Sequence, residues 1–367
     1  MKLNESEKKV LAILKENPYV NQKHIAEQLK LSRPAIANLI SKLQDKGYIL
    51  GKPYMLKTAE YVTCIGSANL DYTFRLEDAI VYKTSNPVKS AISYGGVIRN
   101  VADNLSRLNH SVSLMTVVGD DRAGDDVLSN AKKIMEVFAC DKLKNCNTGG
   151  YYAVIDAFGD MHVGFADMSI NKHMDRSWIL EHKRHLNLST WLIADTNVTK
   201  EALEALIEYA DLEDKKLAII GVSGPKMKHV PENIQGVEMI ICNLDETQSY
   251  FKTNQQDPNV LINLWMKKGV KNAIITDGKN GAIYYDGKKI GVQEAYLVDE
   301  EKKVDVTGAG DAFSSAVLHG LINGEALQDS IKYGAISASL TIQSKYAVNP
   351  NLSINLIKKE QKKHENI

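Results

Sequence analysis

The chain has 367 residues, of which 44% are hydrophobic and 25% charged, a composition typical of a globular protein rather than a disordered or fibrous one. Its formal net charge of zero conceals an uneven distribution, because residues 1–58 contain eleven Lys/Arg and five Asp/Glu, a net charge of +6 that the remainder balances. No run approaches the roughly 20 apolar residues of a membrane span. The four cysteines have no C-x-x-C spacing, so they indicate neither a zinc site nor a disulfide framework and predict reduced thiols in a cytoplasmic protein.

The N-terminal segment, residues 1–58, has the pattern of three short helices and a hairpin. Apolar residues recur at helical spacing in three runs, 10–14, 25–29 and 36–43. Ser32 has the position of an N-cap and Pro34 lies in the first turn, so the third helix begins there. The apolar residues at 48–50 and 54–56 flank Gly51-Lys52-Pro53, which predicts a wing-like hairpin.

This order of elements resembles the winged helix-turn-helix family over residues 4–57. In that family the third helix enters the major groove of DNA, with its early residues facing the bases. The positions that match base contacts are Ser32, Arg33, Ala35 and Asn38, and those that match phosphate contacts are Lys42, Lys46 and Lys52. A module that serves dimerisation, or one that has lost its DNA role, is the alternative.

From residue 59 onward, short apolar runs alternate with helical patterns such as 97–108 and 201–209. The predicted strands are 62–65, 113–118, 152–155, 190–194, 217–220, 239–242, 273–276 and 282–285. This alternation predicts an α/β domain over residues 59–367, with a largely parallel sheet covered by helices on both faces. The polar residues 358–367 are expected to fray.

The most specific signal is the run Asp305-Val306-Thr307-Gly308-Ala309-Gly310-Asp311, which precedes an apolar helical pattern at 312–321. Small residues let backbone N–H groups approach an anion closely, and the start of a helix adds a positive dipole end. Beside such a cradle, the Asp311 carboxylate can accept the proton of an attacking hydroxyl, as phosphoryl transfer requires. Taken alone, the run is also compatible with a Gly-rich turn in which Asp311 only caps a helix.

The run closely resembles the signature of the ribokinase-like (PfkB) carbohydrate kinase family. The resemblance implies a three-layer αβα sandwich with a small β lid, and an ATP-dependent transfer of phosphate to an alcohol group. It also implies that Asp311 is the catalytic base and that Gly308, Ala309 and Gly310 form the anion hole. No G-x-x-x-x-G-K-[ST] sequence occurs, so a P-loop kinase is excluded.

Further motifs match the same family in chain order, over roughly residues 61–357. The residues that the resemblance assigns to the substrate are Asn69, Asp71, Gly95, Gly96 and Asn100. A carboxylate suits this role because it accepts hydrogen bonds from two vicinal hydroxyls. Arg99, inside the Gly-Gly-x-x-x-Asn motif, has no assigned role, and its partner is either a phosphate or an acidic neighbour.

The nucleotide side of the site is implied by two motifs. Asn243-Leu244-Asp245-Glu246 matches Asn-x-x-Glu, in which Asn243 lies near the ATP phosphates and Glu246 governs Mg²⁺ through water. The positions that match the nucleotide loop are Thr276, Gly278 and Gly281. Asp305 and Thr307 match a monovalent cation (K⁺) site, which a loop near 344–349 would complete.

Two stretches, 73–93 and 149–170, match the lid sheet of the family. A lid excludes water, which competes with the substrate hydroxyl for the phosphoryl group. Lid strands also offer an edge for a second copy, so we expect a homodimer. No membrane partner is expected, because the sequence has no long apolar run.

Details of the sequence resemble the pseudouridine kinase branch of the family. The matching runs are 85–87, 95–100, 166–170 and 194–198, and the last contains Asn197 as a further substrate residue. A winged helix joined to the kinase is also found in that branch, which implies conversion of pseudouridine to pseudouridine 5'-phosphate. Gly221-Val222-Ser223 replaces the Asp-Pro of that branch, so another nucleoside or sugar is an alternative. A ligand-sensing transcriptional regulator built on a kinase fold is a further alternative, although Asp311 and Glu246 argue against an inactive site.

Overall fold

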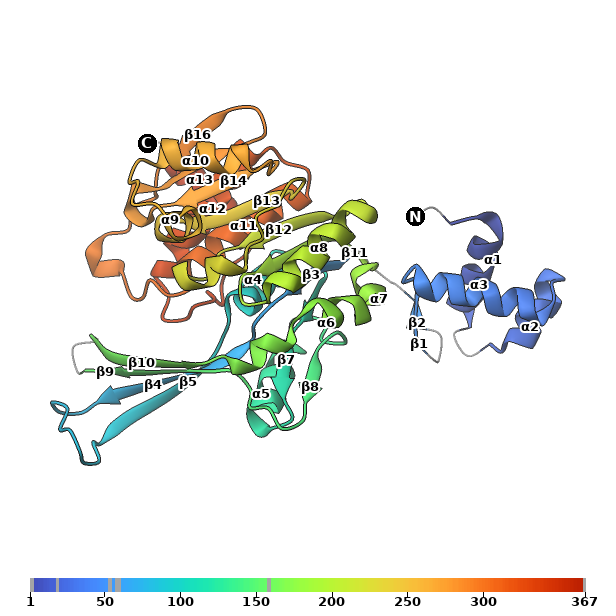
Figure 1. Cartoon of the computed structure of the whole chain (residues 1–367), viewed down its shortest axis with the longest axis horizontal. Helices are drawn as coiled ribbons and strands as arrows, with labels where there is room; N and C mark the ends of the chain where they lie inside the picture. Colours follow the sequence, from blue (N-terminus) through green and yellow to red (C-terminus); the bar gives the residue numbers. More distant parts are fainter. Residues whose placement is uncertain (1–2, 18–19, 52–54, 57–60, 157–159, 366–367) are drawn as a thin grey trace.

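The computed structural model describes residues 3–17, 20–51, 55–56, 61–156 and 160–365. An N-terminal helical unit lies beside a larger α/β unit (Figure 1). Within these ranges, no helix is both long and apolar enough to cross a membrane. All four cysteines are free thiols, as predicted. Residues 57–60, where we place the domain boundary, lie outside the described ranges, so the boundary stays a prediction.

The N-terminal unit is the predicted three-helix arrangement. It contains helices α1 (Glu5–Glu16), α2 (Gln22–Leu29) and α3 (Arg33–Asp45), then the antiparallel strands β1 (Ile49–Gly51) and β2 (Met55–Leu56). Ser32 caps α3, because its Oγ accepts a hydrogen bond from the Ala35 amide at 3.3 Å. Ile36, Ile40 and Leu43 bury one face of α3 in a small separate core. The remainder of the wing, residues 52–54, is outside the described ranges.

The two units touch at the end of α3. The main-chain oxygen of Asp45 accepts a hydrogen bond from Asn187 Nδ2 at 2.6 Å, and the Asp45 carboxylate lies 3.3 Å from Arg184 Nη2. Arg184 belongs to the short helix α7 (Lys183–Leu186). Gly47 lies so near that a Cβ there would come within 3.1 Å of the Arg184 oxygen. These contacts come just before strand β11 (Ser189–Asp195) in the chain.

The α/β unit is organised around an eight-stranded sheet in the order β16-β15-β14-β13-β12-β11-β3-β6. Its strands are β3 (Tyr61–Ile65), β6 (Val112–Met115), β11 (Ser189–Asp195), β12 (Lys216–Ile220), β13 (Met239–Asn243), β14 (Ala273–Thr276), β15 (Ala282–Tyr285) and β16 (Ile290–Gln293). The pairs from β14 to β6 are parallel, whereas β15 and β16 add an antiparallel edge. The predicted strand 113–118 is broken at Thr116, because β7 (Val117–Gly119) leaves this sheet and pairs with β8 (Asp141–Leu143).

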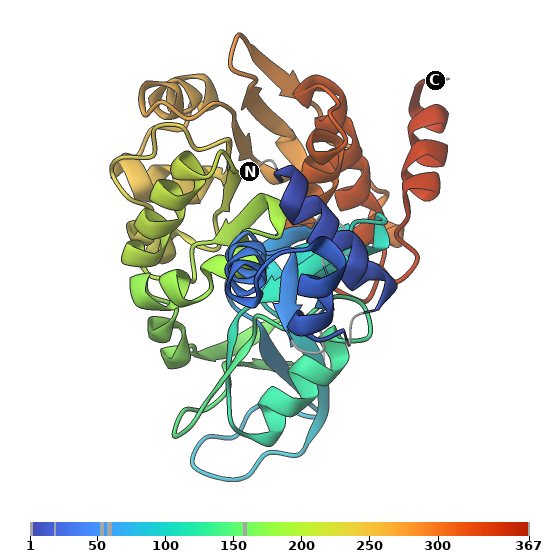
Figure 2. The ribbon, with the colours of Figure 1, turned by 90° about the vertical axis from the view of Figure 1, so that its right-hand side faces the viewer.

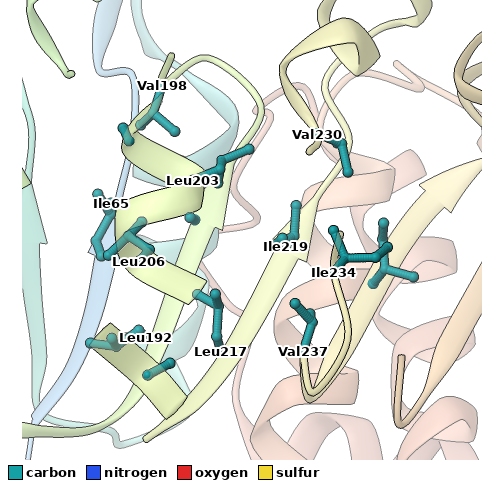
Figure 3. Close-up of a cluster of buried hydrophobic side chains, with 14 of the residues drawn as sticks. Ile65, Leu192, Val198, Leu203, Leu206, Leu217, Ile219, Val230, Ile234 and Val237 are labelled. Carbon is teal, nitrogen blue, oxygen red and sulfur yellow. The ribbon is translucent and has the colours of Figure 1, made fainter. Parts of the chain in front are cut away.

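Helices cover both faces of this sheet, which gives the predicted αβα sandwich. One face carries α6 (Arg176–Glu181), α7, α8 (Lys200–Leu212), α9 (Leu244–Phe251) and α10 (Pro258–Lys267). The other carries α4 (Val97–Arg107), α5 (Arg122–Ala131), α11 (Ala309–Ile322) and α12 (Leu327–Ile342). Figure 2 shows green and yellow helices on one side of the molecule and red helices on the other. Figure 3 shows the first core, in which Leu203 and Leu206 of α8 lie over Leu192 and Leu217 of the sheet.

The C-terminal segment is a helix, α13 (Ile354–Glu365), so the expected fraying of residues 358–367 is wrong for its described part. Ile357 is fully buried together with Leu352, in a small core with Ile336 of α12 and Ala316 of α11. Burial of these apolar side chains provides a driving force for ordering a helix whose residues 358–365 are all polar. The short 3₁₀ segments are η1 (Ser169–His173), η2 (Gly224–His229), η3 (Gly278–Asn280) and η4 (Glu300–Lys302).

A second, four-stranded sheet projects from the sandwich as the predicted lid (Figure 1, lower left). Its order is β10-β9-β4-β5, formed by β4 (Asn69–Leu76), β5 (Val88–Gly95), β9 (Gly150–Ile155) and β10 (Met161–Asp167). The rings of Tyr72 on β4 and Tyr152 on the neighbouring β9 are stacked, with their centroids 5.0 Å apart. The lid strands β4 and β5 extend beyond the expected stretch 73–93, so three predicted substrate residues, Asn69, Asp71 and Gly95, are part of the lid.

Candidate active site

The first predicted substrate residues lie where the lid leaves the main sheet. Asn69 Nδ2 donates a hydrogen bond to Asp71 Oδ1 at 2.6 Å. Gly95 is the strand partner of Asn69, and a Cβ on Gly95 would lie 2.1 Å from Asp71 Oδ2. The missing side chain of Gly95 therefore makes room for this carboxylate. Burial raises the pKa of Asp71 to about 6, against the opposing effect of the Asn69 hydrogen bond.

Helix α4 carries the next part of the site. Its N-cap is Gly96, where glycine is favoured because φ is 101° and a Cβ would lie only 2.2 Å from the Ser67 oxygen. One turn into the helix, Asn100 Nδ2 donates a hydrogen bond to Asp311 Oδ2 at 2.8 Å. The structure thus joins two motifs that stand far apart in the sequence, the Gly-Gly-x-x-x-Asn run and the Gly-Ala-Gly-Asp run.

Asp311 lies in the first turn of α11. Burial raises its pKa to about 7; the Asn100 hydrogen bond opposes this shift, and the nearby carboxylates of Asp195, Glu246 and Asp71 add to it. A carboxylate with a pKa near neutrality can both accept and release a proton under physiological conditions. This is the property that general base catalysis requires.

The start of α11 is built from small residues. Gly308 is left-handed, with a φ of 80°, and a Cβ there would lie 2.0 Å from the Ala347 oxygen. Gly310 is exposed, and a Cβ there would meet no atom within 4 Å. The Ala309 amide already donates to the Val306 oxygen at 3.2 Å, so an anion would gain this amide only if that bond broke. Open space therefore remains in front of the helix start at Gly310.

The predicted nucleotide residues lie along the ends of β13 and β14. Asn243 and Glu246 form a capping box at the start of α9, with both side-chain-to-amide hydrogen bonds at 2.8 Å. Thr276 is the strand partner of Asn243. Gly278 and Gly281 follow in a tight turn with φ values of 49° and 86°. Asn243, Thr276, Gly278 and Gly281 thus lie at or just after the carboxyl ends of β13 and β14, and Glu246 lies in the first turn of α9.

Glu246 is the predicted Mg²⁺ residue, and it is 5% exposed. Burial raises the pKa of its carboxyl, although the hydrogen bond from the Asn243 amide opposes the shift. Gly221 packs against this carboxylate, since a Cβ there would lie 2.2 Å from Glu246 Oε2. No group of three or more His, Cys, Asp or Glu able to hold a metal occurs among the described residues. A single carboxylate fits Mg²⁺ that is held mainly by phosphate and water oxygens.

The predicted K⁺ residues lie on the outer side of the Gly308 turn. Asp305 Oδ1 accepts a hydrogen bond from the Thr307 amide at 2.8 Å, and both residues are exposed. Ala347, in the predicted second loop, contacts Gly308. The structure thus brings the two loops together, as the resemblance implies.

Asp195 is a site residue that the sequence analysis missed. It is fully buried at the end of β11 and accepts hydrogen bonds from the Ile98 amide at 3.2 Å, the Asn197 amide at 2.9 Å and Asn197 Nδ2 at 3.0 Å. Burial raises its pKa to about 6. The run 194–198 singles out Asn197 in the sequence, but the side-chain amide of Asn197 lies against Asp195. The available signal was a carboxylate directly at a strand end.

The predicted DNA-contacting residues lie on α3 or cap its ends, except Lys52, which is outside the described ranges. Arg33, Asn38 and Lys42 are exposed, whereas Ser32 serves as the helix cap. Lys46 differs from the others, because its Nζ lies 2.7 Å from Glu7 Oε1, and the Glu7 side chain is 1% exposed. Lys46 is therefore engaged in holding α3 to α1 and is not free to meet a phosphate.

Comparisons with known proteins agree with both units. The model of the pfkB family of carbohydrate kinases matches residues 59–354, and a winged helix-turn-helix DNA-binding model matches residues 3–49. The chain is 28% identical over 355 residues to "Uncharacterized sugar kinase YeiI" of Escherichia coli (strain K12), covering 96% of this chain and 97% of that protein. It is 26% identical over 304 residues to the pseudouridine kinase of the same organism, covering 82% of this chain and 96% of that protein. A carbohydrate kinase from Agrobacterium tumefaciens has a TM-score of 0.71 and 26% identity, covering 82% of this chain and 96% of that one.

Proposed function

Because the chain belongs to the pfkB family of carbohydrate kinases, and so is a phosphotransferase with an alcohol acceptor, we propose that it transfers phosphate from ATP to a ribosyl hydroxyl. The observation that carries the proposal is the 2.8 Å hydrogen bond between Asn100 and Asp311, in front of the glycine-rich start of α11. Asn100, whose amide can hydrogen-bond a substrate hydroxyl, thus lies beside the Asp311 carboxylate, which can accept the proton of that hydroxyl. An inactive fold that only senses ligands would not need this pairing.

In the proposed reaction, Asp71 and Asn100 hold the acceptor sugar. The hydroxyl oxygen bonds to the γ-phosphorus of ATP, its proton passes to Asp311, and the bond from phosphorus to the β–γ bridging oxygen breaks to release ADP. Amides at the start of α11 face the charge that spreads over the phosphoryl oxygens. Bound Mg²⁺ neutralises phosphate charge, and Glu246 is the residue that would hold it through water.

Pseudouridine is the substrate that we propose, giving pseudouridine 5'-phosphate. It is supported by the relative named pseudouridine kinase and by the runs that resemble that branch. The segment Gly221-Val222-Ser223 departs from the branch and lies against Glu246 through Gly221. Ribose or another nucleoside is therefore the second candidate.

A panel of acceptors tests the substrate. We expect pseudouridine to show the highest kcat/KM with ATP and Mg²⁺ when compared with uridine, guanosine, ribose and fructose 6-phosphate, each product being identified by mass spectrometry. A tenfold or greater preference for ribose or fructose 6-phosphate would refute the pseudouridine assignment. Asp311→Asn should lower kcat by about 10²–10⁴-fold, whereas Asp329→Asn, an exposed carboxylate on α12, should not.

DNA binding by the N-terminal unit is a second proposed function, because that family model matches it and α3 exposes Arg33 and Lys42. Duplexes selected from a random library by binding to the full chain would be titrated at several salt concentrations. Lys42→Ala, at a position that matches a phosphate contact, should reduce the slope of log affinity against log salt by about one. Arg33→Ala, at a position that matches a base contact, should weaken binding and relax the base preference at one position of the selected duplexes. Failure of every duplex to bind at low salt would exclude this function.

The homodimer, the K⁺ site and the cytoplasmic location stay predictions.

A further inference from the structure

Arg99 is a buried cation next to the proposed catalytic residues, and only 6% of it is exposed. Its Nη2 lies 2.9 Å from Asp103 Oδ2 and donates a 2.8 Å hydrogen bond to Asn130 Oδ1 on α5. Its Nη1 donates to the Tyr94 oxygen at 3.5 Å and to Asn100 Oδ1 at 3.3 Å. The acidic neighbour is thus the partner of Arg99 in this structure, and its guanidinium is held from two helices and a strand.

The contact with Asn100 is unusual for a helix, because adjacent side chains on a helix surface do not normally face each other. The guanidinium reaches Asn100 because Asp103, one turn later, and Asn130 draw it across the face of α4. Asn100 is therefore bonded on both sides of its amide, by Arg99 at the oxygen and by Asp311 at the nitrogen.

These two bonds fix the orientation of the amide. The oxygen faces a cation that can only donate, and the NH₂ group faces a carboxylate that accepts when ionised. A flipped amide would set oxygen against carboxylate and NH₂ against guanidinium, and both contacts would be repulsive. Without Arg99, the side chain of Asn100 would lose the partner that selects the orientation seen here.

We propose that Arg99 is a positioning residue, which holds Asn100 so that its Nδ2 donates to Asp311 and keeps this carboxylate ionised as a base. The proposal rests on the proposed role of Asp311. The groups that face Asp311 are Asn100 of α4 and the carboxylates of Asp71, Asp195 and Glu246, which come from three other elements. Asn100 is thus the donor that opposes the pKa-raising influence of its surroundings.

The matched control is Arg107. Its Nε donates to the other Asp103 oxygen at 2.8 Å, and its Nη1 donates to the Pro350 oxygen at 2.8 Å. Arg99→Met and Arg107→Met each remove one arginine from Asp103 and leave the other in place. Only Arg99→Met removes a partner of Asn100, so the pair separates loss of an ion pair from loss of positioning.

The test is the pH dependence of kcat/KM for the acceptor at saturating ATP and Mg²⁺, with the unfolding midpoint of each variant measured in parallel. A base must be ionised, so the rate rises with pH through the pKa of Asp311. Loss of a hydrogen bond to a charged group should move this acid limb to higher pH by about one unit in Arg99→Met. Arg107→Met should leave the limb where it is in the parent enzyme.

A double-mutant cycle decides whether Arg99 acts through Asn100, since its charge also lowers the pKa of Asp71 directly. If it does, Asn100→Ala shifts the limb by itself, and adding Arg99→Met to Asn100→Ala causes no further shift. An unshifted limb in Arg99→Met, or an equal shift in both backgrounds, would overturn the proposal. If Arg99→Met does not fold, Arg99→Lys, which keeps the charge but not the forked donor set, gives the same comparison.

Failure of the proposed base is distinguishable from failure of this inference. If Asp311→Asn turns over at a rate close to that of the parent enzyme, the base assignment is wrong, and the role of Arg99 falls with it. If Asp311→Asn is inactive while Arg99→Met keeps the parent acid limb, only the positioning role is wrong.

Discussion

The carboxylate of Asp195 accepts a hydrogen bond from the backbone amide of Ile98 at 3.2 Å. This bond ties the end of β11 to the first turn of α4, the helix that carries Asn100. The same carboxylate also holds the amide and side chain of Asn197. The fully buried Asp195 thus holds together two segments that carry proposed substrate residues, the start of α4 and the loop after β11.

Replacement of Asp195 by asparagine should weaken the contacts of residue 195 with Ile98 and Asn197. The new NH₂ group would face backbone and side-chain donors, so the free energy of unfolding at pH 7 should fall by about 1–3 kcal/mol. The KM for the acceptor should rise more than kcat falls, because α4 would be displaced while Asp311 is kept. Urea unfolding and steady-state kinetics measure both, with Asp329→Asn as a surface control.

The loss of stability in Asp195→Asn should depend on pH, and it should be larger at pH 5 than at pH 7. The pKa of Asp195 is raised from 3.8 to about 6 in the folded chain, so the folded state binds its proton more tightly. Stability from this group is therefore greatest below the unfolded pKa and is lost as the pH rises towards 6. The stability difference between parent and Asp195→Asn should grow by about 1 kcal/mol from pH 7 to pH 5. An equal difference at both pH values would contradict the raised pKa.

Gly308 and Gly310 should respond in opposite ways to alanine. Gly308→Ala strains a left-handed residue and drives a methyl group against Ala347, so it should lower stability by about 1–3 kcal/mol. Gly310→Ala meets no neighbouring atom in a helical turn, so stability should be kept or raised by up to about 1 kcal/mol. Its methyl group would nevertheless occupy the space proposed for the phosphoryl group, and kcat should fall at least about tenfold. A fully active Gly310→Ala enzyme would show that no phosphoryl group passes there.

Much of the site could be predicted because its motifs stand at strand ends and helix starts, where small residues and carboxylates leave a pattern in the sequence. The pairing of Asn100 with Asp311 could not be predicted, because it depends on how α4 and α11 pack. Asp195 was missed because a buried carboxylate looks the same in sequence as an acid in an exposed turn. The helix α13 was missed for a related reason, since Ile357 is buried by residues of α11 and α12 that are distant in the sequence.

Removal of the charge of Glu246 should affect the metal rather than the fold. Glutamine can also take the last position of a capping box, so Glu246→Gln should keep the start of α9 and change the unfolding temperature little. The apparent Mg²⁺ concentration for half-maximal rate should rise about tenfold or more, because a full negative charge near the phosphates is lost. Asp245→Asn removes an exposed acid next in sequence and is the control. Equal Mg²⁺ requirements in the two variants would remove Glu246 from the metal site.

The pair His110 and His319 should make the enzyme sensitive to acid. His110 Nε2 lies 2.8 Å from His319 Nδ1, on the side of α11 that packs near α13. Burial lowers the pKa of His110 to about 4, and the neighbouring His319 adds to this shift. Burial and Lys358 also lower the pKa of His319. Both rings are therefore neutral in the folded chain at pH 7.

Because the folded pKa of His110 lies below its ordinary value of 6.5, the unfolded chain binds the proton more readily between these two values. The contribution of His110 to stability is thus complete above pH 6.5 and is lost as the pH falls towards 4. His110→Gln should remove about 1–2 kcal/mol of the stability change between pH 7 and pH 5. Urea unfolding at both pH values measures this, with the exposed His162→Gln as the control. If both variants keep the acid sensitivity of the parent chain, another group causes it.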